Sequence, residues 1–134
     1  MKDLPVLKAK RFGIYYCNEE NALSHAATLM TERNISSLVV VDDGGTLRGI
    51  ITRTDLVRAC HRQDDWANQL VRDYMNPDVV TVDLNEPLSR VMELLIDRHI
   101  HRVVAVRHEE GKAVPMGILS AADIVYHMAL QVQD

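Results

Sequence analysis

The sequence predicts an α+β fold, with two tandem β-α-β-β-α repeats packed with pseudo-twofold symmetry. The first observation is an internal repeat: residues 21–41 and 86–106 align with seven identical positions, beginning with Leu23 and Leu88. The second is a Gly-apolar-apolar-Ser/Thr-x-x-Asp segment in each copy, at 49–55 and 117–123. The third is composition, because 47% of the residues are hydrophobic and only 4% are aromatic. Since one copy is marginal as an independent fold, we expect two copies to share an aliphatic core.

Each repeat is expected to begin with a short strand and an amphipathic helix. The strands are predicted at 14–17 and 79–82, and the helices at 21–33 and 86–98. Apolar residues recur at helical spacing along the second of these helices. Pro87 is suited to its first turn.

The second half of each repeat reads as a hairpin followed by a helix. Runs of β-branched residues predict buried strands at 38–41 and 103–106. In the first copy the turn Asp42–Gly45 favours a hairpin. The third strands are predicted at 48–52 and 116–120, and the last helices begin near Arg53 and Ala121.

The predicted division of the chain is a first domain at 8–62, a linker helix at 63–74 and a second domain at 75–131. The segment 67–75 is expected to be helical. Residues 1–10 can be either an ordered arm or a frayed tail, and the pattern does not choose between these.

Charge and composition restrict the classes of function. The net charge of −4 argues against a surface for a nucleic-acid polymer spread over the whole protein. No apolar run reaches the length of a membrane helix, and no signal peptide is evident. We therefore expect a cytoplasmic protein without a membrane segment, whose Cys17 and Cys60 stay reduced.

Motifs for catalysis are missing from the sequence. Neither cysteine belongs to a nucleophile motif, and no G-x-S-x-G, P-loop or G-x-G-x-x-G sequence occurs. His99 and His101 lie two residues apart, but they lack a recognised metal-ligand spacing. The sequence predicts a protein that is not an enzyme and that has no metal site.

The repeats resemble CBS domains, the regulatory modules also found in cystathionine β-synthase, IMP dehydrogenase and the γ subunit of AMP-activated kinase. The resemblance rests on the two Asp-ending segments, on the stretch 75–82 and on the stretch 99–104, and it covers about residues 8–131. It implies a stand-alone CBS pair that senses an adenine nucleotide without catalytic activity. The ligand would be regulatory and not a cofactor: AMP, ADP, ATP, S-adenosylmethionine or a related adenosyl compound.

In the family, the Asp of each segment typically holds the ribose hydroxyls of a bound adenosine, which assigns that role to Asp55 and Asp123. The chemistry agrees, because an ionised carboxylate can accept from both hydroxyls of a cis-diol. Thr52 and Ser120 would place a hydroxyl near the ribose or phosphate. The same Thr/Ser-x-x-Asp pattern is also an ordinary helix N-cap, and one residue can serve both purposes.

The resemblance further implies apolar side chains around the adenine and cations for phosphate. Ile35, Ile100, Val80 and Val114 would contact the adenine, with Tyr16 and Thr81 at the pocket mouth. The His101-Arg102 pair resembles a phosphate-binding pair in the kinase γ subunit, and Arg53 would lie at a helix N-terminus that favours anions. The candidate ligand-binding residues are Tyr16, Ile35, Thr52, Arg53, Thr54, Asp55, Val80, Thr81, Ile100, His101, Arg102, Val114, Ser120 and Asp123.

The two copies differ in charge, so their sites are not equivalent. Ser36-Ser37 stands where the second copy has His101-Arg102, and Ala121-Ala122 stands where the first has Arg53-Thr54. Whether one or both sites fill is left open by the sequence.

The alternative function is a ligand-independent dimerisation or protein-interaction scaffold. Its surface would be an apolar helix face made of Leu56, Val57, Leu70, Val71, Ile124, Val125 and Met128. In either case the resemblance implies a homodimer, acting on an effector protein that the sequence does not identify.

Overall fold

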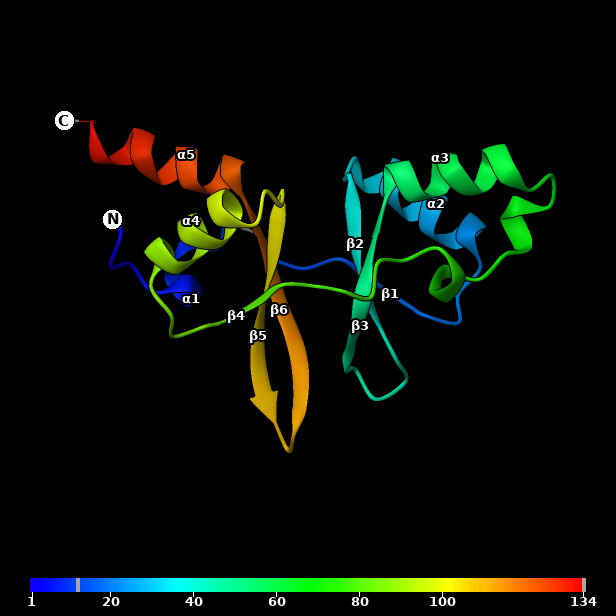
Figure 1. Cartoon of the computed structure of the whole chain (residues 1–134), viewed down its shortest axis with the longest axis horizontal. Coiled ribbons are helices and arrows are strands. Elements are labelled where there is room, and N and C mark those ends of the chain that lie inside the picture. The colour runs from blue at the N-terminus through cyan, green and yellow to red at the C-terminus, as the bar shows by residue number, and fades with distance from the viewer. Residues whose placement is uncertain (12, 134) are drawn as a thin grey trace. The chain divides into compact units, whose positions relative to one another are not determined.

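The computed structural model describes residues 1–11 and 13–133, which form a mixed α+β fold (Figure 1). The chain divides into two compact units. Tyr15–Val79 make the first-repeat unit. Met1–Ile14 together with Val80–Asp134 make the second-repeat unit. The N-terminal fourteen residues, seven of which were assigned to the first domain, thus lie in the compact unit of the second copy.

The first-repeat unit contains one three-stranded sheet with the order β1-β2-β3. Strand β1 runs parallel to β2, and β3 runs antiparallel to β2. Two 3-10 helices, η1 and η2, follow the last α-helix. The elements are β1 (Tyr16–Asn18), α2 (Leu23–Arg33), β2 (Ser37–Val41), β3 (Leu47–Thr52), α3 (Arg53–Arg62), η1 (Trp66–Asn68) and η2 (Val71–Asp73).

The second-repeat unit repeats this topology with the sheet order β4-β5-β6. Its elements are α1 (Val6–Ala9), β4 (Thr81–Asp83), α4 (Leu88–Asp97), β5 (Arg102–Glu109), β6 (Lys112–Ser120) and α5 (Ala121–Gln131). The second copy has three more residues than the first between residue 106 and Gly117, and they extend the β5–β6 hairpin. Figure 1 shows this hairpin running well past the helices of its unit.

The repeat is reproduced in backbone detail. Both sheets shift register at the same place, between Val40 and Val41 and between Ala105 and Val106. The first helix of each repeat is followed by a left-handed residue at the equivalent position, Asn34 and His99, with φ of 51° and 53°. The first strand of each repeat begins two residues later than predicted, because Tyr15 and Val80 contribute only a carbonyl to the neighbouring strand.

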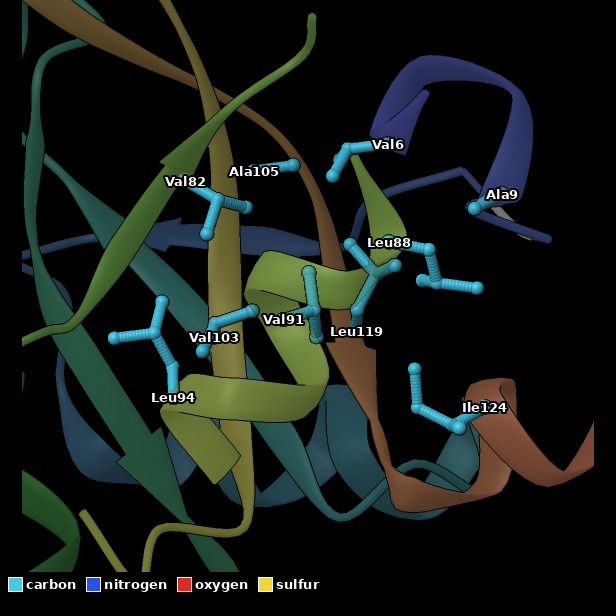
Figure 2. Close-up of a cluster of buried hydrophobic side chains, with 10 residues drawn as sticks. All are labelled: Val6, Ala9, Val82, Leu88, Val91, Leu94, Val103, Ala105, Leu119 and Ile124. Carbon is cyan, nitrogen blue, oxygen red and sulfur yellow. The ribbon is translucent and has the colours of Figure 1, made fainter. Parts of the chain in front are cut away.

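Each unit has its own aliphatic core. Figure 2 shows the core of the second-repeat unit, where Val91 from α4 lies beside Val103 and Leu119 from the sheet. Val6 and Ala9 of α1 belong to this core and are fully buried. The N-terminus is therefore an ordered arm, and its burial explains why it clusters with the second copy.

The segment that joins the copies is not the continuous helix that was predicted over 67–75. It forms η1 and η2, separated by an extended Leu70 that makes a β-bridge with Ala22. The carbonyl of Gln69 accepts a hydrogen bond from the amide of Leu23. These bonds to the start of α2 take the backbone groups that a continuous helix would need.

In residues 1–11 and 13–133 no helix has the length and apolar character to cross a bilayer.

Candidate functional site

In the first-repeat unit, Asp55 is held at the start of α3 by its own N-cap. Its Oδ2 accepts from the amide of Thr52 at 2.8 Å and from the Thr52 hydroxyl at 3.0 Å. The amide of Asp55 donates back to Thr52 Oγ1 at 3.3 Å. This capping box begins α3 at Arg53, as the sequence predicted, and it leaves Oδ1 pointing away from the cap.

Asp123 has the equivalent position at the start of α5. Its Oδ2 accepts from the amide of Ser120 at 2.8 Å and, more weakly, from the Ser120 hydroxyl at 3.4 Å. The helix begins at Ala121, again as predicted. The capping interpretation is therefore correct for both segments, and Oδ2 is the oxygen that the cap occupies in each.

The second oxygen of each carboxylate is held by an arginine, and the two arginines differ in origin. Asp55 Oδ1 lies 2.9 Å from Nη1 of Arg58, three residues along the same helix. Asp123 Oδ1 lies 2.8 Å from Nε of Arg11, which is 112 residues away in the N-terminal arm. The guanidinium of Arg11 also lies over the ring of Tyr126, 4.7 Å from its centroid.

The two ion pairs differ in how far their side chains are buried. The Asp55 side chain is 14% exposed and its Arg58 partner 43%, whereas the Asp123 side chain is 8% exposed and Arg11 24%. Because a charge pair removed from water is stronger and costlier to open than an exposed one, Asp123 is the more firmly held carboxylate.

The other first-repeat candidates gather at the same end of the sheet as Asp55. Strands β1 and β2 start there and β3 ends there, with Ser37 paired to Thr52. Half-buried Ile35 packs against the core beside this end, and exposed Tyr16 begins β1. The amide of Arg53 donates to the carbonyl of Ser36. The structure thus brings these side chains around the helix N-terminus; exposed Thr54 lies in the first turn of α3.

The second-repeat candidates gather in the same way around Asp123. Arg102 begins β5 directly opposite Ser120, so the predicted phosphate-binding pair lies at the end of the sheet where α5 begins. Arg102 is half-buried and His101 is exposed. Exposed Thr81 begins β4, and half-buried Val80 and Ile100 pack against the core.

Val114 is the one candidate that the structure does not bring to this end of its sheet. It lies on the hairpin extension, paired with Arg107, six positions before Ser120 along β6. At the ordinary rise of a strand that spacing is roughly 20 Å. Within its unit, Val114 therefore lies outside the group around Asp123.

Sequence reasoning missed both arginines that hold the carboxylates. Arg58 could have been found, because three-residue spacing from Asp55 on a helix is a standard ion-pair signal. Arg11 carries no such signal, since its partner is distant in sequence.

Across residues 1–11 and 13–133, no three His, Cys, Asp or Glu side chains gather in a way that could hold a metal ion.

Comparison with known proteins identifies the family. The CBS domain model matches residues 9–62 and 71–130. The chain belongs to the CBS domain family. Among curated relatives, a protein of Methanocaldococcus jannaschii called MJ1404 is 28% identical over 96% of this chain, which spans 33% of that relative. The chain spans 24% to 65% of the next two curated relatives it matches.

Solved CBS structures share this fold closely. The CBS domain pair of MJ0100, in complex with 5′-methylthioadenosine and S-adenosyl-L-methionine, has a TM-score of 0.79 at 23% identity and covers 96% of this chain and 98% of its own. CBSX2, in complex with AMP, has a TM-score of 0.78 at 23% identity and covers 97% of this chain and 98% of its own. At this level of identity, the comparison establishes a shared CBS pair fold.

Proposed function

We propose that the chain is a regulatory module without catalytic activity that binds adenine nucleotides or related adenosyl ligands. The observation that carries the proposal is the arrangement in each unit: a carboxylate oriented by an N-cap, with half-buried apolar side chains and a cation beside it. Two CBS pairs of the same fold are complexed with AMP and with S-adenosyl-L-methionine. Those ligands share an adenosine, so the common element to be recognised is a purine carrying a ribose diol.

Each candidate has a distinct role in this proposal. Asp55 and Asp123 accept the ribose hydroxyls, because a carboxylate has acceptor positions beyond those that the cap uses. Ile35 in one unit, with Val80 and Ile100 in the other, offers apolar contact to the adenine. Arg102 supplies a fork of donors for phosphate in the second repeat.

The phosphate contacts differ between repeats. His101 flanks Arg102 at the start of β5, whereas the first repeat has Arg53 at the N-terminus of α3. The guanidinium of Arg53 donates to Asn34 Oδ1 at 3.3 Å, a neutral partner that an anion can replace. Thr52, Thr54, Tyr16, Thr81 and Ser120 add hydroxyl groups at the rim of the same sheet ends.

The proposal is tested by thermal unfolding against AMP, ADP, ATP, S-adenosylmethionine and a GTP control. A ligand at about 100 times its Kd should stabilise the protein by about 2.7 kcal/mol. Asp55→Asn and Asp123→Asn keep a capping side chain but remove the charge, so together they should abolish the shift. Asp97→Asn, an exposed residue at the end of α4, is the matched control. Shifts that survive the double variant would place the ligand elsewhere.

We also propose that the protein forms a homodimer through α5. Val125 and Met128 lie on one face of this helix and Val132 is its C-cap residue, and the three are between 48% and 81% exposed. Such a stripe is typical of an association surface. Met128→Lys should convert a dimer into a monomer in light scattering, whereas Glu32→Lys on the exposed part of α2 should not. An unchanged mass would exclude this surface.

The second candidate function is a ligand-independent scaffold. Of the surface expected for it, the structure buries Val71 and Ile124 and exposes Val57, Val125 and Met128. The exposed α5 face favours this function, and so does the arginine already bound to each carboxylate. A dimer that persists while no adenine ligand changes the melting temperature would support the scaffold over the sensor.

A further inference from the structure

Arg11 occupies the carboxylate that the proposed function assigns to the ribose of the second repeat. Its Nε holds Asp123 Oδ1 at 2.8 Å, and its guanidinium lies 4.7 Å from the Tyr126 ring centroid. Two residues earlier, the carbonyl of Ala9 accepts from His127 Nε2 at 2.7 Å. The arm is thus attached to α5 at successive turns, and Arg11 is oriented by an anion below it and an aromatic face beside it.

A ribose diol and Arg11 compete for the same oxygen. Oδ2 of Asp123 is held by the Ser120 amide, so Oδ1 is the oxygen that the cap leaves for a ligand. Arg11 already takes it with a charge-assisted bond. Binding of a nucleoside at Asp123 therefore requires the guanidinium, which is only 24% exposed, to give up its bond to this carboxylate, and the ligand must offset the loss of that ion pair.

The chemical class of the ligand decides which charge lies next to the ribose, where the guanidinium is displaced. A nucleotide carries a phosphate on the same ribose, and a guanidinium binds phosphate through paired donors. An S-adenosyl sulfonium ligand carries a positive charge on the atom bonded to the 5′ carbon, where a nucleotide carries its phosphate. This charge repels the guanidinium, and the carboxylate of the ligand lies several bonds farther from the ribose. The nucleotide therefore offsets the cost of opening the Arg11–Asp123 pair, and the sulfonium ligand increases it.

We propose that Arg11 is a specificity-determining residue that makes the Asp123 site select phosphate-bearing adenine ligands over sulfonium-bearing ones. This inference rests on the proposed function, since it assumes that Asp123 takes the ribose. It does not extend to the first repeat. There Arg58 belongs to the same helix as Asp55 and is 43% exposed, so it can turn into solvent without needing a ligand anion.

The test measures AMP and S-adenosylmethionine binding by calorimetry in an Asp55→Asn background, which isolates the Asp123 site. Arg11→Gln keeps a donor for Asp123 but removes the charge. It should weaken AMP and strengthen S-adenosylmethionine, lowering the ratio of their affinities by about tenfold, as expected for loss of one charge-assisted contact. Because both ligands bind the same folded state, any loss of stability cancels in this ratio. Arg11→Lys retains the cation and should retain most of the preference.

Lys8→Gln is the matched charge control, because Lys8 is exposed on the same arm and should leave the ratio unchanged. A ratio that stays the same in the Arg11→Gln protein while both ligands bind overturns the role of Arg11 and leaves the proposed function standing. Loss of all binding in the Asp55→Asn background overturns it too, since the Asp123 site would then take no ligand. Failure of both ligands on the unmodified protein overturns the proposed function itself.

Discussion

The two repeat units have the same topology, but the carboxylates at their equivalent positions have different ion-pair partners and different burial. Asp55 and Asp123 occupy equivalent N-cap positions, and each has Oδ2 bound to a backbone amide at 2.8 Å. Asp55 then pairs with an exposed arginine of its own helix, while Asp123 pairs with an arginine brought in by the N-terminal arm. The cap orients the carboxylate in both units, but residues outside the motif control how accessible it is.

This difference has a structural cause in the arms that precede each repeat. Val6 and Val71 are equivalent: the first donates its amide to the carbonyl of Glu86 and the second to that of Asn21. Both arms then run along the last strand of the sheet, Lys10 against Gly117 and Asn76 against Gly49. One arm continues into a charged Arg11, whereas the other carries a neutral Asn76 at the matching position. This side chain is one of the differences that make the two sites unlike.

The largest expected effect on stability comes from substituting the two carboxylates themselves. Asp123→Ala should lower the free energy of unfolding by about 3 kcal/mol, because it removes both a cap and the buried carboxylate that pairs with Arg11. Asp55→Ala should cost about 1 kcal/mol, mostly the cap, since an exposed ion pair contributes little. Urea denaturation monitored by circular dichroism gives both values. A double-mutant cycle with Arg11→Ala isolates the pair, and equal costs for the two carboxylates would contradict the comparison.

The arms provide the next contrast, at equivalent glycines of β3 and β6. A Cβ at Gly49 would lie 2.7 Å from the backbone oxygen of Asn76, whereas at Gly117 it would lie 3.0 Å from the Cδ of Lys10. A backbone atom must be displaced as part of the strand, but a lysine stem can turn aside. Gly49→Ala should therefore cost about 2 kcal/mol and Gly117→Ala less than about 1 kcal/mol in the same denaturation assay. A larger cost at Gly117 would indicate that Lys10 is rigidly packed.

A third pair of substitutions tests where the arms are equal. Val6 and Val71 are both fully buried, each in the core of its own unit. Removing two methyl groups should cost about 1.6 kcal/mol in transfer free energy at either site. Similar denaturation midpoints for Val6→Ala and Val71→Ala are expected. A Val6 variant as stable as the unmodified protein would mean that the N-terminal arm does not contribute to the second-repeat core in solution.

Local patterns were sufficient to predict the strands and the longer helices of each repeat, but not α1 or the two 3-10 helices of the joining segment. The Thr/Ser-x-x-Asp segments located the starts of α3 and α5, because a capping box is a relation between residues three apart. The repeat located the strands, since an insertion confined to the hairpin does not disturb the register of the rest. The candidate ligand-binding residues around each carboxylate were implied by the resemblance to CBS domains.

Long-range pairing could not be predicted in this way. The packing of residues 1–14 on the second copy depends on tertiary burial of Val6 and Ala9, which leaves no periodic signal in so short a segment. The ion pair between Arg11 and Asp123 depends on this packing of the N-terminal arm. Val114 was assigned to the adenine by the resemblance, but the long hairpin places it on the extension of β6. The sequence therefore predicted the helix start that carries each carboxylate, but it did not predict that Arg11 from the distant N-terminal arm pairs with Asp123.

The smallest expected effect lies at the centre of the first strand of each sheet, where Cys17 is equivalent to Val82. Both are buried, at 3% and 2% exposure, but only Cys17 can ionise. Burial raises the pKa of the Cys17 thiol from 9.0 to about 12. Between these values the unfolded chain releases the proton while the folded protein keeps it, so the free energy of unfolding falls as the pH rises above 9.

Cys17→Val places in the first repeat the side chain that the second repeat already has, and it should remove this alkaline loss. At pH 10 the unmodified protein should have lost about 1.4 kcal/mol more than the variant, the value of one pKa unit. The readout is the difference between the two urea-derived stabilities at pH 8 and pH 10, which cancels the tyrosines and lysines common to both. Cys60→Ser is the control, because that thiol is exposed and should leave the slope unchanged. Parallel stability curves for the Cys17→Val and unmodified proteins would show that Cys17 reaches solvent in the folded state, and that the first sheet is more open than the second.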